Sequence, residues 1–257
     1  MAFHVLLELK NKLEKEFRKY FPKRISSLGM YIQKFKSLSG LEIGGPSYAF
    51  NKSGFLPLYQ HIKKLDGCNF STNTIWEGEI ESGKTYHYEN GIGHQFILDG
   101  SDLSEIADNK YDFVFSSHNL EHIANPIKAL LEWRRVLKNE GYLLLILPNK
   151  LGTFDIKREY TSFEHILEDY NSNITEADTT HIEEILKLHD HTKNPISIGI
   201  SEFEELIKDN YTTRAAHHHV FDQHLIKKML EHINFEVLST QFFSSIHIVT
   251  LAKAIKS

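Results

Sequence analysis

The feature that constrains the fold most is residues 111–149, where two apolar runs flank an amphipathic segment. Residues 111–115 are a short apolar run that contains one acid, Asp112, and residues 142–147 are a continuous apolar run; such runs are typical of strands that are buried on both faces. Pro126 suits the first turn of a helix between them, because the N–H that proline lacks is not needed there. We expect Gly141 to end that helix. Strand, helix and strand predict a βαβ unit with two parallel strands.

The composition is that of an ordinary soluble globular protein, with 41% apolar and 25% charged residues. A formal net charge of −5 gives no broad basic surface, so nucleic acid is not an expected partner. No apolar run approaches the roughly 20 residues that cross a bilayer, and the N-terminus lacks the apolar core of a signal peptide. The single cysteine, Cys68, excludes an internal disulfide and a cysteine-based zinc site. We therefore expect a cytoplasmic protein without a membrane partner.

The first half of the chain carries the candidate ligand-binding turns. Residues 1–38 have the periodicity of two helices, and residues 39–47 read as a strand and its turn. Gly44 and Gly45 would let the backbone approach a ligand closely. The turn lacks the Gly-x-Gly-x-x-Gly pattern, which counts against a nicotinamide-dependent oxidoreductase.

Two acids follow short candidate strands. Asp66 comes about 20 residues after the glycine turn, where Rossmann-like domains place the acid that accepts from the ribose hydroxyls. A turn-capping role before Gly67 is the alternative. Asp99 follows residues 95–98, which read as a third strand. For the glycine-rich residues 67–94 the sequence pattern predicts no particular helix or strand.

Residues 111–149 resemble the later half of the class I S-adenosyl-L-methionine (SAM) dependent methyltransferase domain, of the methyltransferase type 11 kind. The resemblance rests on Asp112, on Leu-Glu-His at 120–122, on Arg-Val-Leu-Lys at 135–138 and on the apolar run 143–147. Tyr142 replaces the second glycine of the family's Gly-Gly pair. The resemblance implies an α/β, Rossmann-like fold with a seven-stranded, mostly parallel sheet and helices on both faces.

The same resemblance implies SAM as the cofactor and assigns residues to it. Asp66 would bind the ribose and Asp99 the adenine, whereas Pro46 and Tyr48 depart from the family's glycine loop. At the elbow after the fourth strand, His118 and His122 are candidate catalytic bases, or caps of the following helix. The implied cofactor-binding residues are Glu42, Gly44, Gly45, Ser47, Asp66, Asp99, Gly100, Ser116 and Ser117.

The family pattern divides the chain into three parts. Residues 1–38 form N-terminal helices, residues 39–150 and 220–257 form the SAM-binding domain, and residues 151–219 form a helical insertion after the fifth strand that we expect to act as a substrate lid. Because arginine matches phosphate and carboxylate geometry, the insertion supplies candidate anion clamps. The candidate substrate-binding residues are Arg158, Arg214 and His217.

The insertion is also dense in imidazole and carboxylate groups, and the whole chain has 16 histidines. Such ligands suit Mg²⁺, Mn²⁺ or Fe²⁺, so a divalent cation (Mn²⁺ or Mg²⁺) is a candidate cofactor. His165 and Asp169 stand four residues apart. The alternative is a polar lid with solvated histidines. The candidate metal ligands are Asp155, Asp178, His181, His189, Asp190 and His218.

Several segments resemble a subgroup of these methyltransferases that is often encoded with bacterial capsule and surface-polysaccharide enzymes. They are LEIGGPS, SSHNLEHIANPIKALLEW, TFDIKR and HHHVF. This resemblance implies O-methylation of a sugar, nucleotide-sugar or phosphate-linked small acceptor. A non-catalytic SAM-fold partner protein and an NAD(P)-dependent oxidoreductase are the alternatives, and formation of a homodimer stays open.

Overall fold

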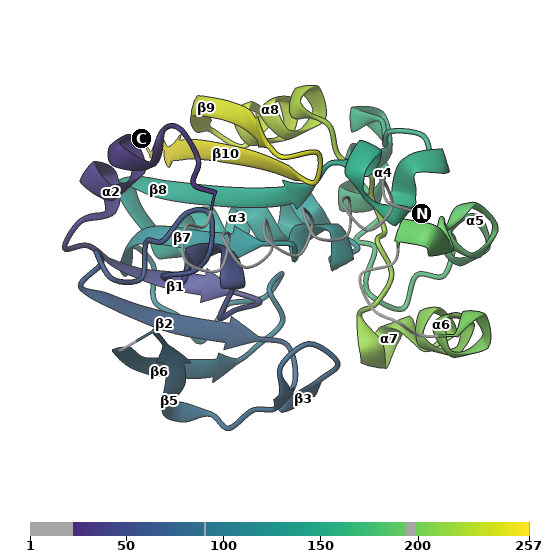
Figure 1. The fold of residues 1–257 in the computed structure, drawn as a ribbon, viewed down its shortest axis with the longest axis horizontal. Coiled ribbons are helices and arrows are strands. Elements are labelled where there is room, and N and C mark those ends of the chain that lie inside the picture. Colours follow the sequence, from purple (N-terminus) through teal and green to yellow (C-terminus); the bar gives the residue numbers. More distant parts are fainter. Residues whose placement is uncertain (1–22, 90, 194–198, 257) are drawn as a thin grey trace, which may run out of the picture.

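A mixed sheet of eight strands forms the centre of the protein (Figure 1), in the order β5-β6-β2-β1-β7-β8-β10-β9. The computed structural model describes residues 23–89, 91–193 and 199–256. The first expected helix therefore lies outside the described residues. The sheet strands are β1 Ser39–Ile43, β2 Lys64–Asn69, β5 Gly83–Tyr88, β6 Gly91–Ile97, β7 Tyr111–Ser117, β8 Leu137–Pro148, β9 Phe235–Phe243 and β10 His247–Ala254. A separate pair consists of β3 Asn73–Thr74 and β4 Gly78–Glu79.

The sheet confirms a Rossmann-like α/β fold but corrects the predicted strand number. Strands β6, β2, β1, β7 and β8 run parallel, and β10 and β9 close the sheet as an antiparallel pair. The eighth strand, β5, pairs antiparallel with β6 at the sheet edge. It comes from residues 67–94, which the sequence left without an assignment.

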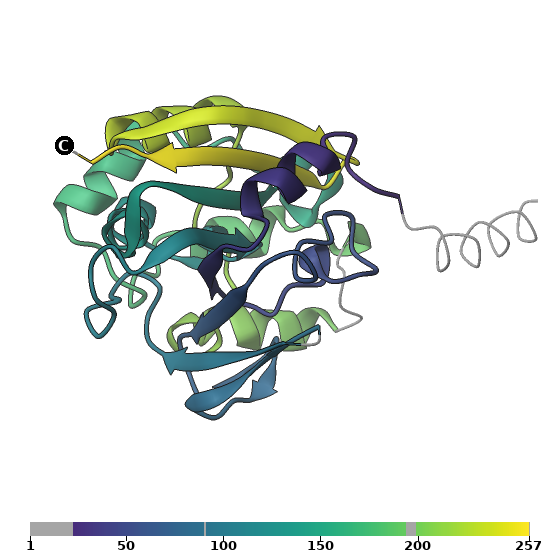
Figure 2. The same cartoon turned by 90° about the vertical axis from the view of Figure 1, so that its left-hand side faces the viewer.

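Helices cover both faces of the sheet, because successive side chains of each buried strand point to opposite faces. Val114 packs in one core, whereas Phe113 and Phe115 pack in the other. Figure 2 shows α2 and α3 on opposite sides of the sheet. The covering helices are α2 Leu28–Phe35 on one face, and α3 Pro126–Val136 and α8 Gln223–His232 on the other.

The predicted βαβ unit is present, although its helix is shorter than expected. Asn125 caps the helix by accepting from the backbone N–H of Lys128, and Pro126 occupies the first turn. The prediction that Gly141 ends this helix is wrong. The helix stops at Val136 because Leu137 already pairs with Tyr111 as the first residue of β8.

The insertion between β8 and α8 lies at the carboxyl ends of the parallel strands (Figure 1). It has a small apolar cluster of its own, built around Ile185, Phe203, Ile207 and Ala216. Its helices are α4 Phe163–Asn171, α5 Ile182–Leu188, α6 Ile200–Lys208 and α7 Asn210–Thr213. None of the described helices of the protein combines the length and the hydrophobicity needed to cross a bilayer.

Gly93 of β6 lies directly against the backbone of β2, which gives a test of the sheet. A Cβ atom on Gly93 would lie 1.7 Å from the carbonyl oxygen of Leu65. Since only backbone movement could relieve this clash, we expect Gly93→Ala to lower the free energy of unfolding by about 1–3 kcal/mol, measured by urea denaturation. Gly29→Ala in α2 is the control, because an added methyl meets nothing within 4 Å there. Equal stability of the two variants would contradict the close approach.

Candidate active site

A cavity of about 510 Å³ opens at the carboxyl ends of β1, β2 and β7. Gly44 lines it after β1, Asn69 lines it at the end of β2, and Ser117 lines it at the end of β7. Strand β1 lies between β2 and β7, so the strand order reverses at this point. In open α/β sheets, ligands bind in the crevice at such a reversal.

The glycine turn at the cavity requires glycine for steric reasons. Gly44 has φ 75°, a conformation that residues with a side chain rarely adopt. A Cβ atom on Gly44 would lie 2.4 Å from Nδ2 of Asn119, which also lines the cavity. The neighbouring Gly45 does not line the cavity, and its Cβ position points at the Glu42 carboxyl group.

Glu42 holds this turn in place from beneath. Its carboxylate is fully buried and accepts hydrogen bonds of 2.7 Å from the hydroxyls of Tyr59 and Tyr86. It also accepts from the backbone N–H of Ser47 at 3.1 Å. Burial raises the pKa of the Glu42 carboxyl, and the three donors oppose that rise. Glu42 does not line the cavity, so its contribution is to position Ser47, which does.

Asp66 lies in the middle of β2, not at its carboxyl end, and does not line the cavity. Its carboxylate accepts from the backbone N–H of His94 and from the Tyr111 hydroxyl, each at 2.9 Å, and pairs with the Lys64 ammonium at 2.9 Å. The strand continues to Asn69, whose side chain is buried at the cavity. The predicted ribose position of Asp66 therefore does not fit the structure.

Asp99 and Gly100, two of the residues predicted to contact the cofactor, line the cavity. One oxygen of Asp99 accepts from the backbone N–H and the hydroxyl of Ser101, at 2.8 and 2.7 Å. The other lies 3.1 Å from Nη2 of Arg214, and Nη1 of Arg214 lies 3.0 Å from the Glu176 carboxylate. Arg214 thus lines the cavity from the insertion and joins it to the sheet.

Both elbow histidines line the cavity. Nε2 of His118 lies 2.8 Å from Nδ1 of His247, and its Nδ1 lies 3.5 Å from the buried Glu121 carboxylate. Burial lowers the pKa of His122 and of His247 to about 3, so both imidazoles are neutral near pH 7. His118 is therefore held between a carboxylate and a neutral imidazole at the cavity surface.

Three further residues that the sequence predicts to contact the cofactor or the substrate do not line the cavity: Ser116, Arg158 and His217. Ser116 is fully buried behind it. Nη1 of Arg158 lies 3.1 Å from Asp155 and 2.8 Å from the carbonyl oxygen of His217, and Nδ1 of His217 lies 2.6 Å from Asp155. Arg158 and His217 thus hold the insertion together. The cavity residues that sequence reasoning missed include Asn69, Trp76, Asn119 and His247.

Comparison with known proteins agrees with this architecture. Residues 57–145 match the family described as a methyltransferase domain. No curated protein matches the chain. Among solved structures, an S-adenosylmethionine-dependent methyltransferase from Mesorhizobium loti has 10% sequence identity and a TM-score of 0.52, with 88% of this chain and 95% of that chain covered. The chain therefore has the fold of a SAM-dependent methyltransferase, and the family match supports that class of enzyme.

Two other solved structures are similar to this chain, with lower TM-scores. A SAM-dependent methyltransferase from Aquifex aeolicus has 13% identity and a TM-score of 0.44, with 89% of each chain covered. The 1,6-didemethyltoxoflavin-N1-methyltransferase from Burkholderia thailandensis, which contains its acceptor and S-adenosylhomocysteine, has 8% identity and a TM-score of 0.45. That match covers 99% of this chain and 89% of the other.

The metal ligands that the sequence predicts do not converge. Among the described residues, His181 alone of the predicted set joins a group of nearby candidate ligands, together with His165, Asp169 and His219. The rest have separate partners: Asp155 pairs with Arg158 and His217, Asp178 with Thr180, Asp190 with Thr192, and His218 with Asn210 and Glu176, while His189 stacks on Phe154.

The buried Asp66 carboxylate predicts a pH-dependent stability. Burial by itself raises its pKa, but hydrogen bonds from His94, Lys64 and Tyr111 outweigh burial and lower it. The ionised carboxylate therefore stabilises the fold above the ordinary pKa of about 3.9, and this stabilisation is lost as the pH falls through the lower folded value. We expect Asp66→Asn to cost about 1–3 kcal/mol near pH 7, and less below about pH 4, in urea denaturation. A cost that does not change with pH would contradict this account.

Proposed function

We propose that the protein is a SAM-dependent methyltransferase that methylates an oxygen of a sugar, nucleotide-sugar or phosphate-linked small acceptor. The observation that carries the proposal is the cavity at the strand-order reversal, where Gly44, Asn69 and Asp99 converge from three consecutive strands. The family match over residues 57–145 includes Asn69 and Asp99. The acceptor class, and a place in surface-polysaccharide biosynthesis, follow from the sequence resemblance alone.

Each part of the cofactor has a candidate partner in the cavity. Gly44 and the backbone at Ser117 would face the methionine part, since the glycine turn leaves room for close approach. Asp99 would accept from the adenine amino group. Asn69, which ends β2, takes the ribose role that the sequence assigned to Asp66, because only Asn69 of the two lines the cavity.

His118 is the proposed general base. Methyl transfer requires the acceptor oxygen to be aligned with the sulfonium methyl and, for a hydroxyl, to lose its proton. His118 lies at the cavity with the Glu121 carboxylate 3.5 Å from its Nδ1. Its Nε2 lies 2.8 Å from Nδ1 of His247 and would accept the proton once an acceptor hydroxyl takes the place of that imidazole. His122 is the second candidate, although burial lowers its pKa to about 3 and makes it a weak base. Arg214 is the proposed anion contact for the acceptor.

The turn after β1 argues against the oxidoreductase alternative. Dinucleotide-binding folds place the pyrophosphate at the N-terminus of a helix that follows this turn. Here the turn leads into a single 3₁₀ turn, Tyr48–Phe50. Calorimetric titration with SAM, S-adenosylhomocysteine and NADH tests the choice, and transfer of labelled methyl groups to sugar phosphates separates an enzyme from a non-catalytic partner protein. Binding of NADH but not SAM would overturn the proposal.

A pair of variants distinguishes the two candidate ribose contacts. We expect Asn69→Ala to weaken SAM binding about three- to tenfold, the effect of one neutral hydrogen bond. We expect Asp66→Asn, the matched change on the same strand, to leave the SAM dissociation constant within about twofold. Titration calorimetry below the melting temperature of both variants measures the difference. Stronger weakening in Asp66→Asn than in Asn69→Ala would restore the original assignment.

The base assignment is tested by kinetics. We expect His118→Asn to lower kcat by about 10²–10⁴-fold, the usual contribution of a general base, with little change in SAM affinity. The matched variant His122→Asn removes the other imidazole of the elbow, which lines the same cavity, and we expect this variant to retain most of its activity. If His122→Asn abolishes methyl transfer and His118→Asn does not, the base is His122.

A further inference from the structure

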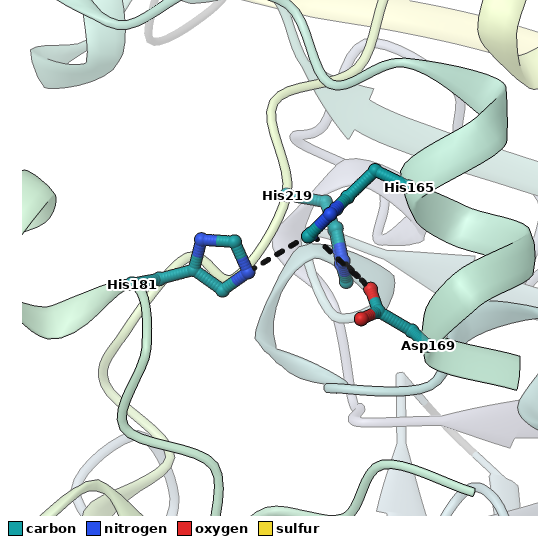
Figure 3. Close-up of side chains that lie close together, drawn as sticks. All are labelled: His165, Asp169, His181 and His219. Atoms are coloured by element: carbon teal, nitrogen blue, oxygen red, sulfur yellow. Dashed lines mark hydrogen bonds and ion pairs between the residues drawn. The ribbon is translucent and has the colours of Figure 1, made fainter. Parts of the chain in front are cut away.

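Four side chains of the insertion, all outside the cavity, converge on one point (Figure 3). His165 and Asp169 lie in α4, His181 directly precedes α5, and His219 lies in the segment before α8. Each offers one ligand atom, and these atoms all lie within 4.8 Å of one another. None of the four lines the cavity.

Three of the separations are close to the edge length of a zinc coordination tetrahedron. Nε2 of His165 lies 3.2 Å from Nε2 of His181 and 3.4 Å from Oδ2 of Asp169. Nε2 of His219 lies 2.8 Å from the same Asp169 oxygen. Ligands about 2.0–2.1 Å from a tetrahedral Zn²⁺ are roughly 3.3 Å apart. A hydrogen bond joins two side chains, whereas here the ligand atoms of all four side chains lie within 4.8 Å of one another.

We propose that His165, Asp169, His181 and His219 together bind one Zn²⁺ ion. Three imidazole nitrogens and one carboxylate oxygen are ligand types that zinc accepts, whereas Mg²⁺ and Ca²⁺ prefer oxygen ligands. Four protein ligands fill a tetrahedral shell, so the ion stabilises structure and leaves no open position for a substrate. The site is independent of methyl transfer and of the proposed function.

The ion would fasten three segments that are separate in the sequence. It would join α4 to the start of α5 and to residues 217–219. The last of these segments leads to the cavity, because Nε2 of His218 lies 3.5 Å from Glu176, which pairs with Arg214. Loss of the ion should therefore loosen the insertion as a whole.

The test is metal analysis of the full chain, purified without a histidine tag. We expect close to one equivalent of zinc by inductively coupled plasma mass spectrometry. Removal with a chelator should lower the melting temperature, and added Zn²⁺ should restore it, because binding to the native state stabilises it. Co²⁺ in place of zinc should give the visible absorption of a tetrahedral ion.

Matched variants locate the ion. His165→Ala and His181→Ala should lose the zinc, whereas the exposed His224→Ala should keep it. His122→Ala is the stricter control, because His122 belongs to a second group of nearby ligands, with Glu121 and His217. Loss of zinc in His122→Ala but not in His181→Ala would overturn the proposal. So would a metal-free protein whose melting temperature does not respond to Zn²⁺.

Discussion

The buried carboxylate of Glu42 is the interaction on which the candidate site depends. Burying a carboxylate is costly unless hydrogen bonds compensate, and here the donors come from three separate segments. Ser47 donates from the glycine turn, Tyr59 from the following loop and Tyr86 from β5. Removing any one of them would leave buried charge less satisfied, so the turn, the loop and the edge strand stabilise one another.

This network gives a physical reason for the strand that the sequence did not predict. β5 supplies Tyr86, which completes the set of donors to Glu42, and the Tyr86 ring also fills the space left open by Gly67. A Cβ atom on Gly67 would lie 2.1 Å from that ring. Gly67 thus marks close packing against one tyrosine, whereas a Cβ atom on Gly78 or Gly83 would meet nothing within 4 Å. The number of glycines in the sequence indicated only loops and did not separate these cases.

The parts of the fold that were predictable are those with local, continuous signals. Residues 111–149 combine two apolar runs with a helix whose start is fixed by Asn125 and Pro126, and the structure has all three elements. β2 is different, because it has the polar sequence Lys-Leu-Asp-Gly-Cys-Asn. Its end was placed at Asp66 because nothing local shows that the partners of this carboxylate are His94 and Tyr111, far along the chain. The sequence therefore assigned the ribose contact to Asp66, which does not line the cavity, and overlooked Asn69, which does.

In the insertion, too, the sequence could not show which side chains lie together in the folded chain. The density of histidine and aspartate indicated metal chemistry, but spacing could identify only the pair His165 and Asp169, which share a helix face. The other members of the group, His181 and His219, come from different elements and meet this pair only in the folded chain. Most of the residues that were predicted as ligands instead pair with close neighbours, as Asp178 does with Thr180.

Arg214 couples the position of the insertion to the cavity. Its two terminal nitrogens pair with carboxylates on opposite sides, Asp99 beside the sheet and Glu176 in the loop between α4 and α5. Glu176 in turn accepts from the backbone N–H of Ala124, directly before the cap of α3. Moving the insertion away from the sheet must therefore break one of these charge-assisted contacts, each of which is stronger than a neutral hydrogen bond. A ligand that competes for Asp99 would release one side of Arg214, so occupation of the cavity and the position of the insertion are linked through a single side chain.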